Sequence, residues 1–468
     1  MKKSKLLNII PTLKKWEIRK LYQFLESPYF NQRKDVIRLL DFLLGEADKK
    51  NPNFNQASAF AFVYPDKAFS ESKYYLISSY LFKLIEEFLA IRDIKSDETT
   101  LSIHLIKAYR KRNMAENFGV TFKKLKISQE KQNLRDSKYL RRSYDFELEY
   151  YDFVGSRSRA KENNIETVSN LFDAYYIAEK LKQYCMQWTH QTVFKKEYSL
   201  GLKKEILQFL ANNNELFEYS AITIYYHCYM AISTGEDIYF EQLLALINKH
   251  GKEFSPEEMR AIYFIAINFC IRQLNDGDNH HEQKMFELYK DGIENGYLLI
   301  NGEISSFTFK NTVSIGINAN QFDWVEIFIR ESTDKLAKNI RKNTANYSLA
   351  YLRYKQKNYK ESMKLLASFD ASDIFISLDA KLLLLRIYYE LEEYDTLTSL
   401  LDSMRVYLNR KEVLGYHKDL YKNIITVTFK LLALQDYDKA SKETLRKQIL
   451  EIKTINTREW FLEQLEKR

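Results

Sequence analysis

Apolar residues recur along this chain at steps of three and four, the spacing that places them on one face of an α-helix. The clearest example runs from Ser70 to Ile91 and carries its apolar residues at Tyr74, Ile77, Leu81, Leu84, Phe88 and Ile91. No stretch alternates between polar and apolar residues for long, so the sequence contains no convincing β-strand. The pattern therefore predicts an all-α protein.

The first part of the chain differs from the rest, because four of its five prolines lie at or before Pro65. Four helices are predicted here: Thr12–Glu26, Asn31–Leu44, Gln56–Phe62 and Ser70–Ile91. Ser70 is a candidate N-cap for the last of them. The charged segment Arg92–Glu98 is predicted to be a linker, which gives a small N-terminal helical domain over residues 1–95.

From Thr99 onward the pattern is a series of amphipathic helices separated by short polar breaks. The breaks that indicate turns are Asn212–Asn214, Ser233–Asp237, Asn275–Asn279 and Asn301–Glu303. They predict helical hairpins over Ser102–Gln132, Glu215–Lys249 and Pro256–Gly292. We therefore expect divergent hairpins over residues 96–300 and a further region over residues 301–468.

A short phrase recurs in this last region, each time between two predicted helices. Its aromatic residue falls at Phe322, Tyr359, Tyr394 and Tyr437, with gaps of 37, 35 and 43 residues. Repeats of this length are typical of stacked helical hairpins, because a lone hairpin cannot bury its apolar side.

The phrase resembles the tetratricopeptide repeat, whose period is about 34 residues. In the best unit, Leu349 and Ala350 match the family's leucine and small residue, and Ser362 matches the small residue where two helices touch. The family's closing proline is missing, so the match is degenerate. The resemblance implies an α-α superhelix of hairpins, and a helix over Thr457–Glu466 is expected to cap its end.

In that family the first helix of each hairpin lines a concave groove. Carried over by position, the groove residues are Lys310, Tyr347, Tyr351, Tyr354, Lys355, Arg386 and Tyr389. Tyrosine combines apolar area with a hydroxyl that can stay hydrated, which suits an interface. The expected ligand is a protein segment with carboxylates and apolar anchors. In the other interpretation these tyrosines simply pack the hairpins together.

The charge of the chain is concentrated between Lys107 and Lys161. This stretch holds fifteen Lys or Arg and seven Asp or Glu, and its excess of +8 equals that of the whole chain. Its central basic residues are Lys123, Lys124, Lys126, Lys131, Arg135, Lys138, Arg141 and Arg142. With the tyrosines between them they could bind nucleic acid. The alternative is a solvated or protein-binding face.

Little in the sequence indicates catalysis, and we expect no enzyme and no cofactor. Glycine and proline are scarce (12 and 5 residues), and no phosphate-loop, nucleophile-elbow or zinc-protease motif occurs. The densest polar group, around Asp278, His280 and His281, departs from a calcium loop because His281 stands where glycine is needed. A polar turn is the favoured interpretation, with a transition-metal site as the alternative. His227 beside Cys228 is interpreted as core.

The three widely spaced cysteines suit a reducing compartment. The apolar run before Pro11 is too short for a signal peptide, and no apolar stretch is long enough to span a membrane. The abundance of lysine, asparagine, isoleucine, tyrosine and phenylalanine is typical of an AT-rich bacterial genome. Together these features predict a cytoplasmic scaffold or adaptor that binds a protein or peptide, or alternatively a nucleic-acid-associated regulatory protein. The identity of the partner and the oligomeric state stay open.

Overall fold

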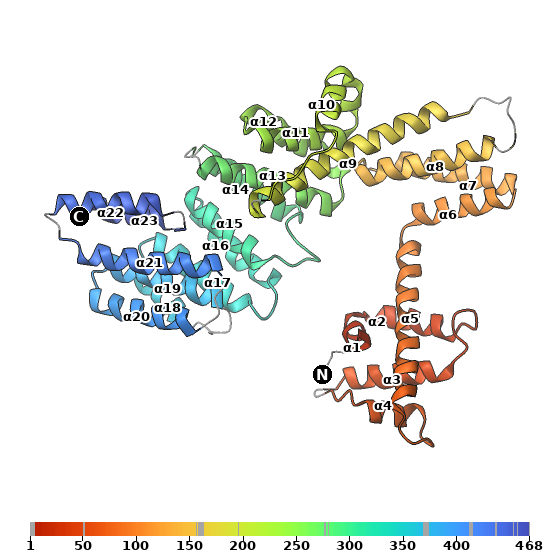
Figure 1. The fold of residues 1–468 in the computed structure, drawn as a ribbon, viewed down its shortest axis with the longest axis horizontal. Coiled ribbons are helices and arrows are strands. Elements are labelled where there is room, and N and C mark those ends of the chain that lie inside the picture. Colours follow the sequence, from red (N-terminus) through yellow and green to blue (C-terminus); the bar gives the residue numbers. More distant parts are fainter. Residues whose placement is uncertain are drawn as a thin grey trace. The chain divides into compact units, whose positions relative to one another are not determined.

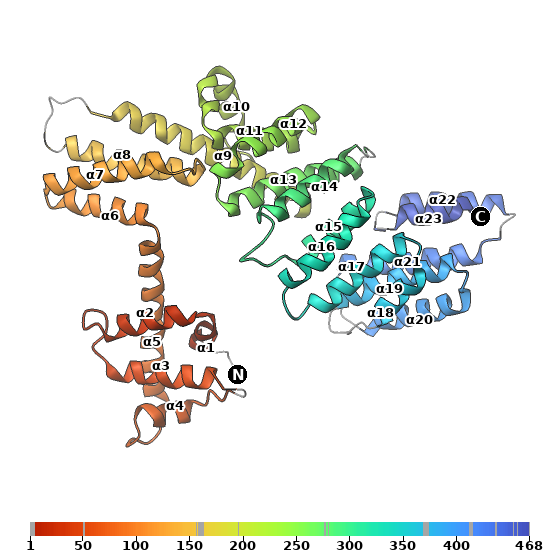
Figure 2. The ribbon, with the colours of Figure 1, turned by 180° about the vertical axis from the view of Figure 1, so that it is seen from behind.

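The computed structural model describes residues 5–49, 52–155, 157, 163–194, 196–275, 278, 280–367, 374–410, 415–435, 438–452, 454–455 and 457–467. The protein is 81% helical, and its described part contains 23 α-helices and no strand, which confirms the all-α prediction. It divides into two compact units, Met1–Lys180 and Leu181–Arg468, and the division falls within helix α9 (Figures 1 and 2). The predicted boundaries at residues 95 and 300 stay predictions.

The first unit begins with five helices that share one core. They are α1 (Lys5–Ile9), α2 (Lys15–Glu26), α3 (Lys34–Ala47), α4 (Gln56–Val63) and α5 (Glu71–Ser96). Leu21, Leu39 and Leu81 are fully buried where α2, α3 and α5 meet. The predicted apolar face of α5 is confirmed, because Tyr74 and Phe88 are also buried in this core.

The charged segment Arg92–Glu98 is not a linker, and that prediction was wrong. Helix α5 continues through Ser96, and α6 (Glu98–Lys111) begins after the single residue Asp97. Arg92 forms an ion pair with Glu17 and stacks over the ring of Trp16, so charged residues here support the helix. The Asp97 carboxylate caps α6 by accepting from the N–H groups of Thr99 and Thr100.

The remaining helices of this unit are α6, α7 (Ala115–Lys131), α8 (Ser137–Gly155) and the first part of α9 (Ile165–Phe194). Helices α6, α7 and α8 run side by side (Figures 1 and 2), which confirms the predicted hairpin over Ser102–Gln132. Their shared core contains Phe118, whose ring stacks on Phe153 with 3.9 Å between centroids. This three-helix group carries the basic stretch.

The second unit starts with two of the predicted hairpins, preceded by α10 (Lys203–Asn212). The first pairs α11 (Ser220–Thr234) with α12 (Asp237–His250), and the second pairs α13 (Pro256–Asn275) with α14 (His281–Glu294). The predicted turn at Ser233–Asp237 is confirmed, whereas most of the predicted turn at Asn275–Asn279 lies outside the described residues. Tyr225 and Tyr263 are almost completely buried between the helices.

Four further hairpins follow, and they correspond to the recurring phrase. They are α15 (Ser306–Asn318) with α16 (Phe322–Ser332), α17 (Arg341–Lys355) with α18 (Tyr359–Ala367), α19 (Ile374–Glu390) with α20 (Tyr394–Arg410), and α21 (Gly415–Ala433) with α22 (Lys439–Glu451). Phe322, Tyr359 and Tyr394 each begin the second helix of a hairpin, whereas Tyr437 lies outside the described residues.

The turns of the first three of these hairpins have the same geometry. Asn320, Lys357 and Glu392 each precede the aromatic residue by two positions and have positive φ angles of 59°, 62° and 60°. In the second hairpin Lys357 N–H donates to the Tyr354 carbonyl (2.9 Å) and Asn358 N–H to the Arg353 carbonyl (2.9 Å). The other two hairpins have the same pair of hydrogen bonds, in which successive N–H groups donate to the carbonyls three and five residues earlier in the chain. This is a Schellman ending, so the recurring phrase encodes a recurring turn.

Small residues let the paired helices approach closely. The Ser362 hydroxyl donates to the Ala350 carbonyl at 2.8 Å, and both residues are fully buried, which agrees with the predicted contact between α17 and α18. In the first hairpin a methyl group added at Gly316 would lie 2.5 Å from Val325 Cγ2. Consecutive hairpins also contact each other, α15 with α17 and α17 with α19. That the hairpins wind into a superhelix stays a prediction.

The chain ends in α23 (Arg458–Lys467), which confirms the predicted terminal helix. It lies beside α22 (Figures 1 and 2) and buries Trp460, Phe461 and Leu465 in the core of the last hairpins.

Candidate functional site

The seven residues predicted for the groove lie on the first helices of three successive hairpins. Lys310 lies on α15, Arg386 and Tyr389 lie on α19, and the other four lie on α17. Because α17 contacts both α15 and α19, these side chains belong to one region of the second unit. They divide into a group that other side chains hold in place and a group whose side chains form no hydrogen bond or ion pair within the described part of the chain.

Glu390, the last residue of α19, is the centre of the first group. Its Oε1 atom accepts from the Tyr354 hydroxyl and from Trp460 Nε1 (2.8 Å). Its Oε2 atom accepts from the Tyr359 hydroxyl and from Lys357 Nζ (3.0 Å). Glu390 therefore joins α17, α18, α19 and α23. We call Glu390 and its four donors the Glu390 clamp.

The electrostatics of the Glu390 clamp are those of a stabilised buried carboxylate. Its side chain is only 9% exposed, and burial alone would raise its pKa. The hydrogen bonds from Tyr354, Tyr359, Trp460 and Lys357 outweigh burial and lower the pKa of Glu390 to about 2. The carboxylate is therefore fully charged at neutral pH, and Tyr354 is part of the packing between helices.

Lys310 and Tyr389 are also held in place. Lys310 Nζ forms an ion pair with Asp379 Oδ2 at 2.8 Å, and the other oxygen of Asp379 accepts from the Tyr421 hydroxyl at 3.2 Å. Tyr389 is 5% exposed, and its ring lies against Trp460 with 5.4 Å between centroids. These two predicted residues therefore fix neighbouring helices in this structure.

The four remaining residues, Tyr347, Tyr351, Lys355 and Arg386, form a second group that we call the anchor cluster. Within the described part of the chain, none of them makes a side-chain hydrogen bond or ion pair. Tyr347, Tyr351 and Arg386 are partly exposed, and Lys355 is exposed. The sequence placed these residues on one face, and the structure adds that their polar groups are left without partners.

The anchor cluster is held together by ring and charge contacts. Lys355 Nζ lies 5.9 Å from the centre of the Tyr351 ring. Burial and then the negative charge of Asp379 raise the pKa of Tyr347 well above its ordinary value, and the positive charge of Arg386 opposes that rise. The Nε atom of Arg386 is buried and donates to no acceptor among the described residues.

A buried guanidinium N–H without an acceptor is costly, because the group has lost its water without gaining a partner. A carboxylate from outside the chain would supply the acceptor, since guanidinium and carboxylate pair in a planar two-bond geometry. The hydroxyls of Tyr347 and Tyr351 could add bonds to the same group. The anchor cluster is thus suited to a carboxylate ligand.

A hollow lies next to the anchor cluster at the end of Lys355. It has a volume of about 300 Å³ and is lined by Glu282, Ile317, Asn318, Asn320, Phe322, Lys355 and Glu459. Most of its lining is polar, and the nearly buried Ile317 and the half-buried Phe322 contribute the smaller apolar part. Its size suits a single side chain of a bound protein segment.

The basic stretch is only partly available for a ligand. Arg142 pairs with Asp97, and Arg135 donates to backbone carbonyls of Gln132 and Leu134 and stacks over Tyr139. The residues of this set that are exposed are Lys123, Lys124, Lys126, Lys131, Lys138 and Arg141. Arg141 lies 3.9 Å from Asp145, and Lys138 also interacts with another residue of the protein. The lysines of α7 are therefore the part of this set that remains without a partner among the described residues.

The tyrosines of the basic stretch are used in packing. Tyr150 stacks on Phe122 with 4.7 Å between ring centroids, and Tyr144 packs on Phe172 at 5.3 Å. Stacking of nucleic-acid bases on these rings would require them to leave their present contacts.

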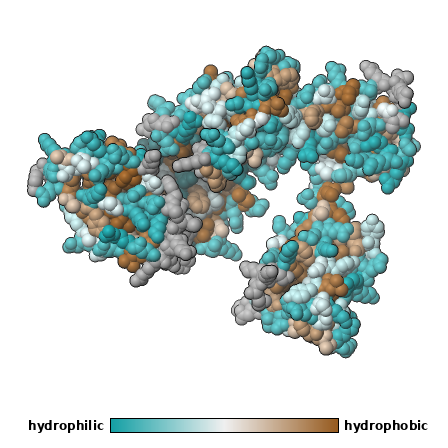
Figure 3. All heavy atoms as spheres, in the orientation of Figure 1, coloured by the Kyte–Doolittle hydropathy of each residue, from teal (hydrophilic) through white to brown (hydrophobic). Residues whose placement is uncertain are grey.

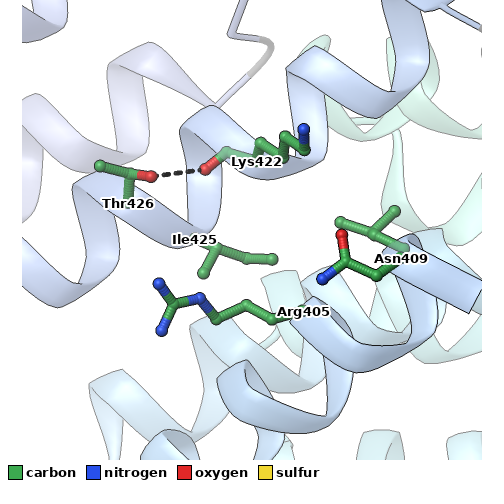
Figure 4. Close-up of a pocket in the computed structure, with 6 residues that line it drawn as sticks. Arg405, Asn409, Lys422, Ile425 and Thr426 are labelled. Carbon is green, nitrogen blue, oxygen red and sulfur yellow. Dashed lines mark hydrogen bonds between the residues drawn. The ribbon is translucent and has the colours of Figure 1, made fainter.

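A second pocket, of about 250 Å³, lies between α20 and α21 (Figure 4). Arg405 and Asn409 line it from one helix, and Lys422, Ile425 and Thr426 line it from the other. The Thr426 hydroxyl donates to the Lys422 carbonyl of its own helix at 2.9 Å. This pocket offers positive charge but no nucleophile beside a base.

The three cysteines belong to the interior, whereas His227 is half-buried. Burial raises the pKa of Cys270 to about 12, and it also raises the pKa values of Cys185 and Cys228. His227 Nδ1 lies 2.8 Å from the Thr223 carbonyl of its own helix. A thiol with a raised pKa is a poor nucleophile at neutral pH.

Large apolar side chains also remain on the surface of the N-terminal helices, where Figure 3 shows hydrophobic residues among hydrophilic ones. Tyr29, Phe62 and Leu76 are 88%, 54% and 61% exposed.

None of the described helices combines the length and the apolar character that crossing a bilayer requires.

No protein-family model, no curated protein and no solved structure matches this chain.

Proposed function

We propose that this protein is a helical-repeat adaptor that binds an acidic segment of a partner protein through the anchor cluster. The observation that carries the proposal is the buried Nε atom of Arg386, which has no hydrogen-bond acceptor among the described residues. Tyr347 and Tyr351 are partly exposed, and their hydroxyls likewise make no hydrogen bond within that part of the chain. The proposed ligand group is therefore a carboxylate, carried beside an aromatic or aliphatic side chain.

The surrounding charges support this choice of ligand. Asp379 and Glu390 are each engaged by a lysine. Neither Lys355 nor Arg386 forms an ion pair within the described part of the chain, although Glu282 and Glu459 also line the hollow beside Lys355. A positive surface with complementary charge steers an acidic partner toward it and rejects basic ones. The hollow beside Lys355 has the size for one side chain of the segment that carries the carboxylate.

The architecture supports an adaptor as well. Hairpins that repeat one turn and contact their neighbours build an extended surface by adding similar units. Such a surface suits a linear segment of a partner better than a small molecule. The fold by itself does not establish this function, so the proposal depends on the anchor cluster.

The test starts from a displayed library of random linear peptides, selected on the purified full-length chain. Selected peptides should be enriched in Asp or Glu next to an aromatic or aliphatic residue. The variant Arg386→Ala should bind such a peptide about 10- to 100-fold more weakly, because a hydrogen bond to a charged group contributes about 1.5–3 kcal/mol. The matched control is Arg330→Ala, on α16 with its side chain 73% exposed, and it should bind normally.

Two outcomes would contradict this function. The first is a selection that yields no acidic peptides. The second is an Arg386→Ala variant that keeps the affinity of the unmodified protein while its circular dichroism shows an intact fold.

The alternative function is association with nucleic acid through the lysines of α7. It is supported by the exposure of Lys123, Lys124, Lys126 and Lys131, which lack partners among the described residues. Because neighbouring tyrosines are packed, binding would be mainly to phosphates and independent of sequence. A salt titration with mixed DNA and RNA tests it: affinity that falls steeply with salt supports the alternative, and no binding at low salt removes it.

A further inference from the structure

His281, the first residue of α14, is completely buried and lies between two carboxylates. Its Nε2 atom is 3.0 Å from Asp237 Oδ1, at the start of α12, and its Nδ1 atom is 3.3 Å from Asp278 Oδ2. The two carboxylates therefore face opposite nitrogens of one ring. This group joins the hairpin of α11 and α12 to the hairpin of α13 and α14.

The hydrogen bond to Asp237 defines the protonation of Nε2, whereas no hydrogen bond among the described residues defines that of Nδ1. The short contact to Asp237 is a hydrogen bond, in which Nε2–H donates to the carboxylate. A neutral ring with its proton on Nε2 has a lone pair on Nδ1. That Nδ1 atom is buried and has no hydrogen bond to any described residue, although the Asp278 carboxylate is close to it. The lone pair of Nδ1 and the electron pairs of the Asp278 carboxylate repel each other, and a cation between the two atoms would remove this repulsion.

The distance between Nδ1 and Asp278 Oδ2 fits a metal ion. Two ligands of a tetrahedral Zn²⁺, with bonds of about 2.0–2.1 Å, are about 3.3 Å apart. A metal-bound histidine usually donates its other N–H to a carboxylate, which fixes the ring and makes the ligand more basic. In the same way, His281 donates its Nε2–H to the Asp237 carboxylate.

Asp278 is also held in position for such a role. Its Oδ1 atom accepts from the backbone N–H of His280 at 3.1 Å, and its own N–H donates to the Gln273 carbonyl at 2.9 Å. These bonds keep Oδ1 at the beginning of α14 and leave Oδ2 directed toward His281. The nearby ammonium group of Lys284 is engaged by Glu241, so it does not fill the position between Asp278 and His281.

We propose that Asp278 and His281 bind a divalent transition-metal ion of the Zn²⁺ type, through Oδ2 and Nδ1. Asp237 orients the imidazole, and water completes the coordination. The imidazole and carboxylate ligands favour Zn²⁺ or Co²⁺ over Ca²⁺, which prefers an all-oxygen shell. The ion fixes Asp278 and His281 at the start of α14, and the hydrogen bond of His281 to Asp237 links this position to the start of α12, which gives the ion a structural role.

The test uses the full chain after removal of metals with a chelator. Zn²⁺ titrated in competition with a chromophoric chelator should bind at one site, and Co²⁺ should give the visible absorption bands of a tetrahedral complex. His281→Gln and Asp278→Asn should abolish this binding. Asp237→Asn should weaken it about 10- to 100-fold, because it removes the charge that orients the ring.

The matched control is His280→Gln, since His280 is the exposed neighbour of His281 and should not contribute. Binding that survives His281→Gln in a variant with normal circular dichroism overturns the proposal. It is also overturned if the unmodified chain binds neither ion and nuclear magnetic resonance shows protons on both nitrogens of His281, because a proton then takes the place of the metal.

Discussion

Replacing Glu390 by glutamine should destabilise the second unit strongly and in a pH-dependent manner. Glutamine has nearly the same size, but it offers one acceptor oxygen in place of two. Glu390 now accepts from Tyr354, Tyr359, Lys357 and Trp460. The variant therefore removes the charge of the Glu390 clamp and leaves some of its buried donors unpaired.

The magnitude follows from the pKa of this carboxyl group. Its fall from an ordinary value of 4.5 to about 2 corresponds to about 3 kcal/mol of stability for the folded state. Because the folded-state pKa is the lower one, this contribution is fully present above about pH 5. It is lost as the pH falls from about 4.5 toward 2, where the carboxyl group becomes protonated even in the folded protein.

The assay is urea unfolding of the full chain at several pH values, followed by circular dichroism and by tryptophan fluorescence, to which Trp460 contributes. Glu390→Gln should lose about 3 kcal/mol of unfolding free energy at pH 7, and the difference from the unmodified chain should shrink below pH 4.5. The control Glu393→Gln changes an exposed glutamate three positions away and should have little effect. A loss below about 0.5 kcal/mol, or one that does not change with pH, would refute the reasoning.

Three further predictions concern helix contacts, helix caps and thiol reactivity. Gly316→Ala should lower the stability by about 1–3 kcal/mol in thermal unfolding, because the added methyl group would meet Val325. Val325→Ala should restore part of the loss, and an unchanged midpoint of thermal unfolding in Gly316→Ala contradicts the close contact. Asp97→Ala should cost about 1 kcal/mol because it removes the cap of α6, whereas Ser70→Ala, at a position without a cap bond, should cost much less; equal costs contradict this assignment. The three buried cysteines should react with a thiol reagent only after unfolding, and rapid reaction in the folded protein would show that they are accessible.

The helices and their turns were predictable because they depend on neighbouring residues. The breaks at Ser233–Asp237 and Asn301–Glu303, and the recurring aromatic at the start of a second helix, are local signals that the structure reproduces. The linker prediction over Arg92–Glu98 failed because charged residues occur both in linkers and on the exposed sides of helices. Only the contact of Arg92 with Glu17, far away in the sequence, distinguishes the two cases.

The Glu390 clamp could not be predicted, because its donors come from positions between 30 and 70 residues distant. For the same reason the sequence placed Tyr354 and Tyr351 on one face but could not distinguish them. Tyr354 meets a buried carboxylate and belongs to the packing, whereas Tyr351 meets none. Asp237 was likewise missed as a partner of His281, because it lies on another hairpin.

The central claim is that Arg386 recognises a carboxylate of a partner segment, and a double-mutant cycle tests it most directly. Calorimetry would measure the affinity of a selected acidic peptide, and of the same peptide with its carboxylate changed to an amide, for the unmodified chain and for Arg386→Ala. The two changes should be coupled by about 1.5 kcal/mol or more, because each removes the same interaction. Additive effects, with a coupling below about 0.5 kcal/mol, would show that Arg386 does not bind the carboxylate.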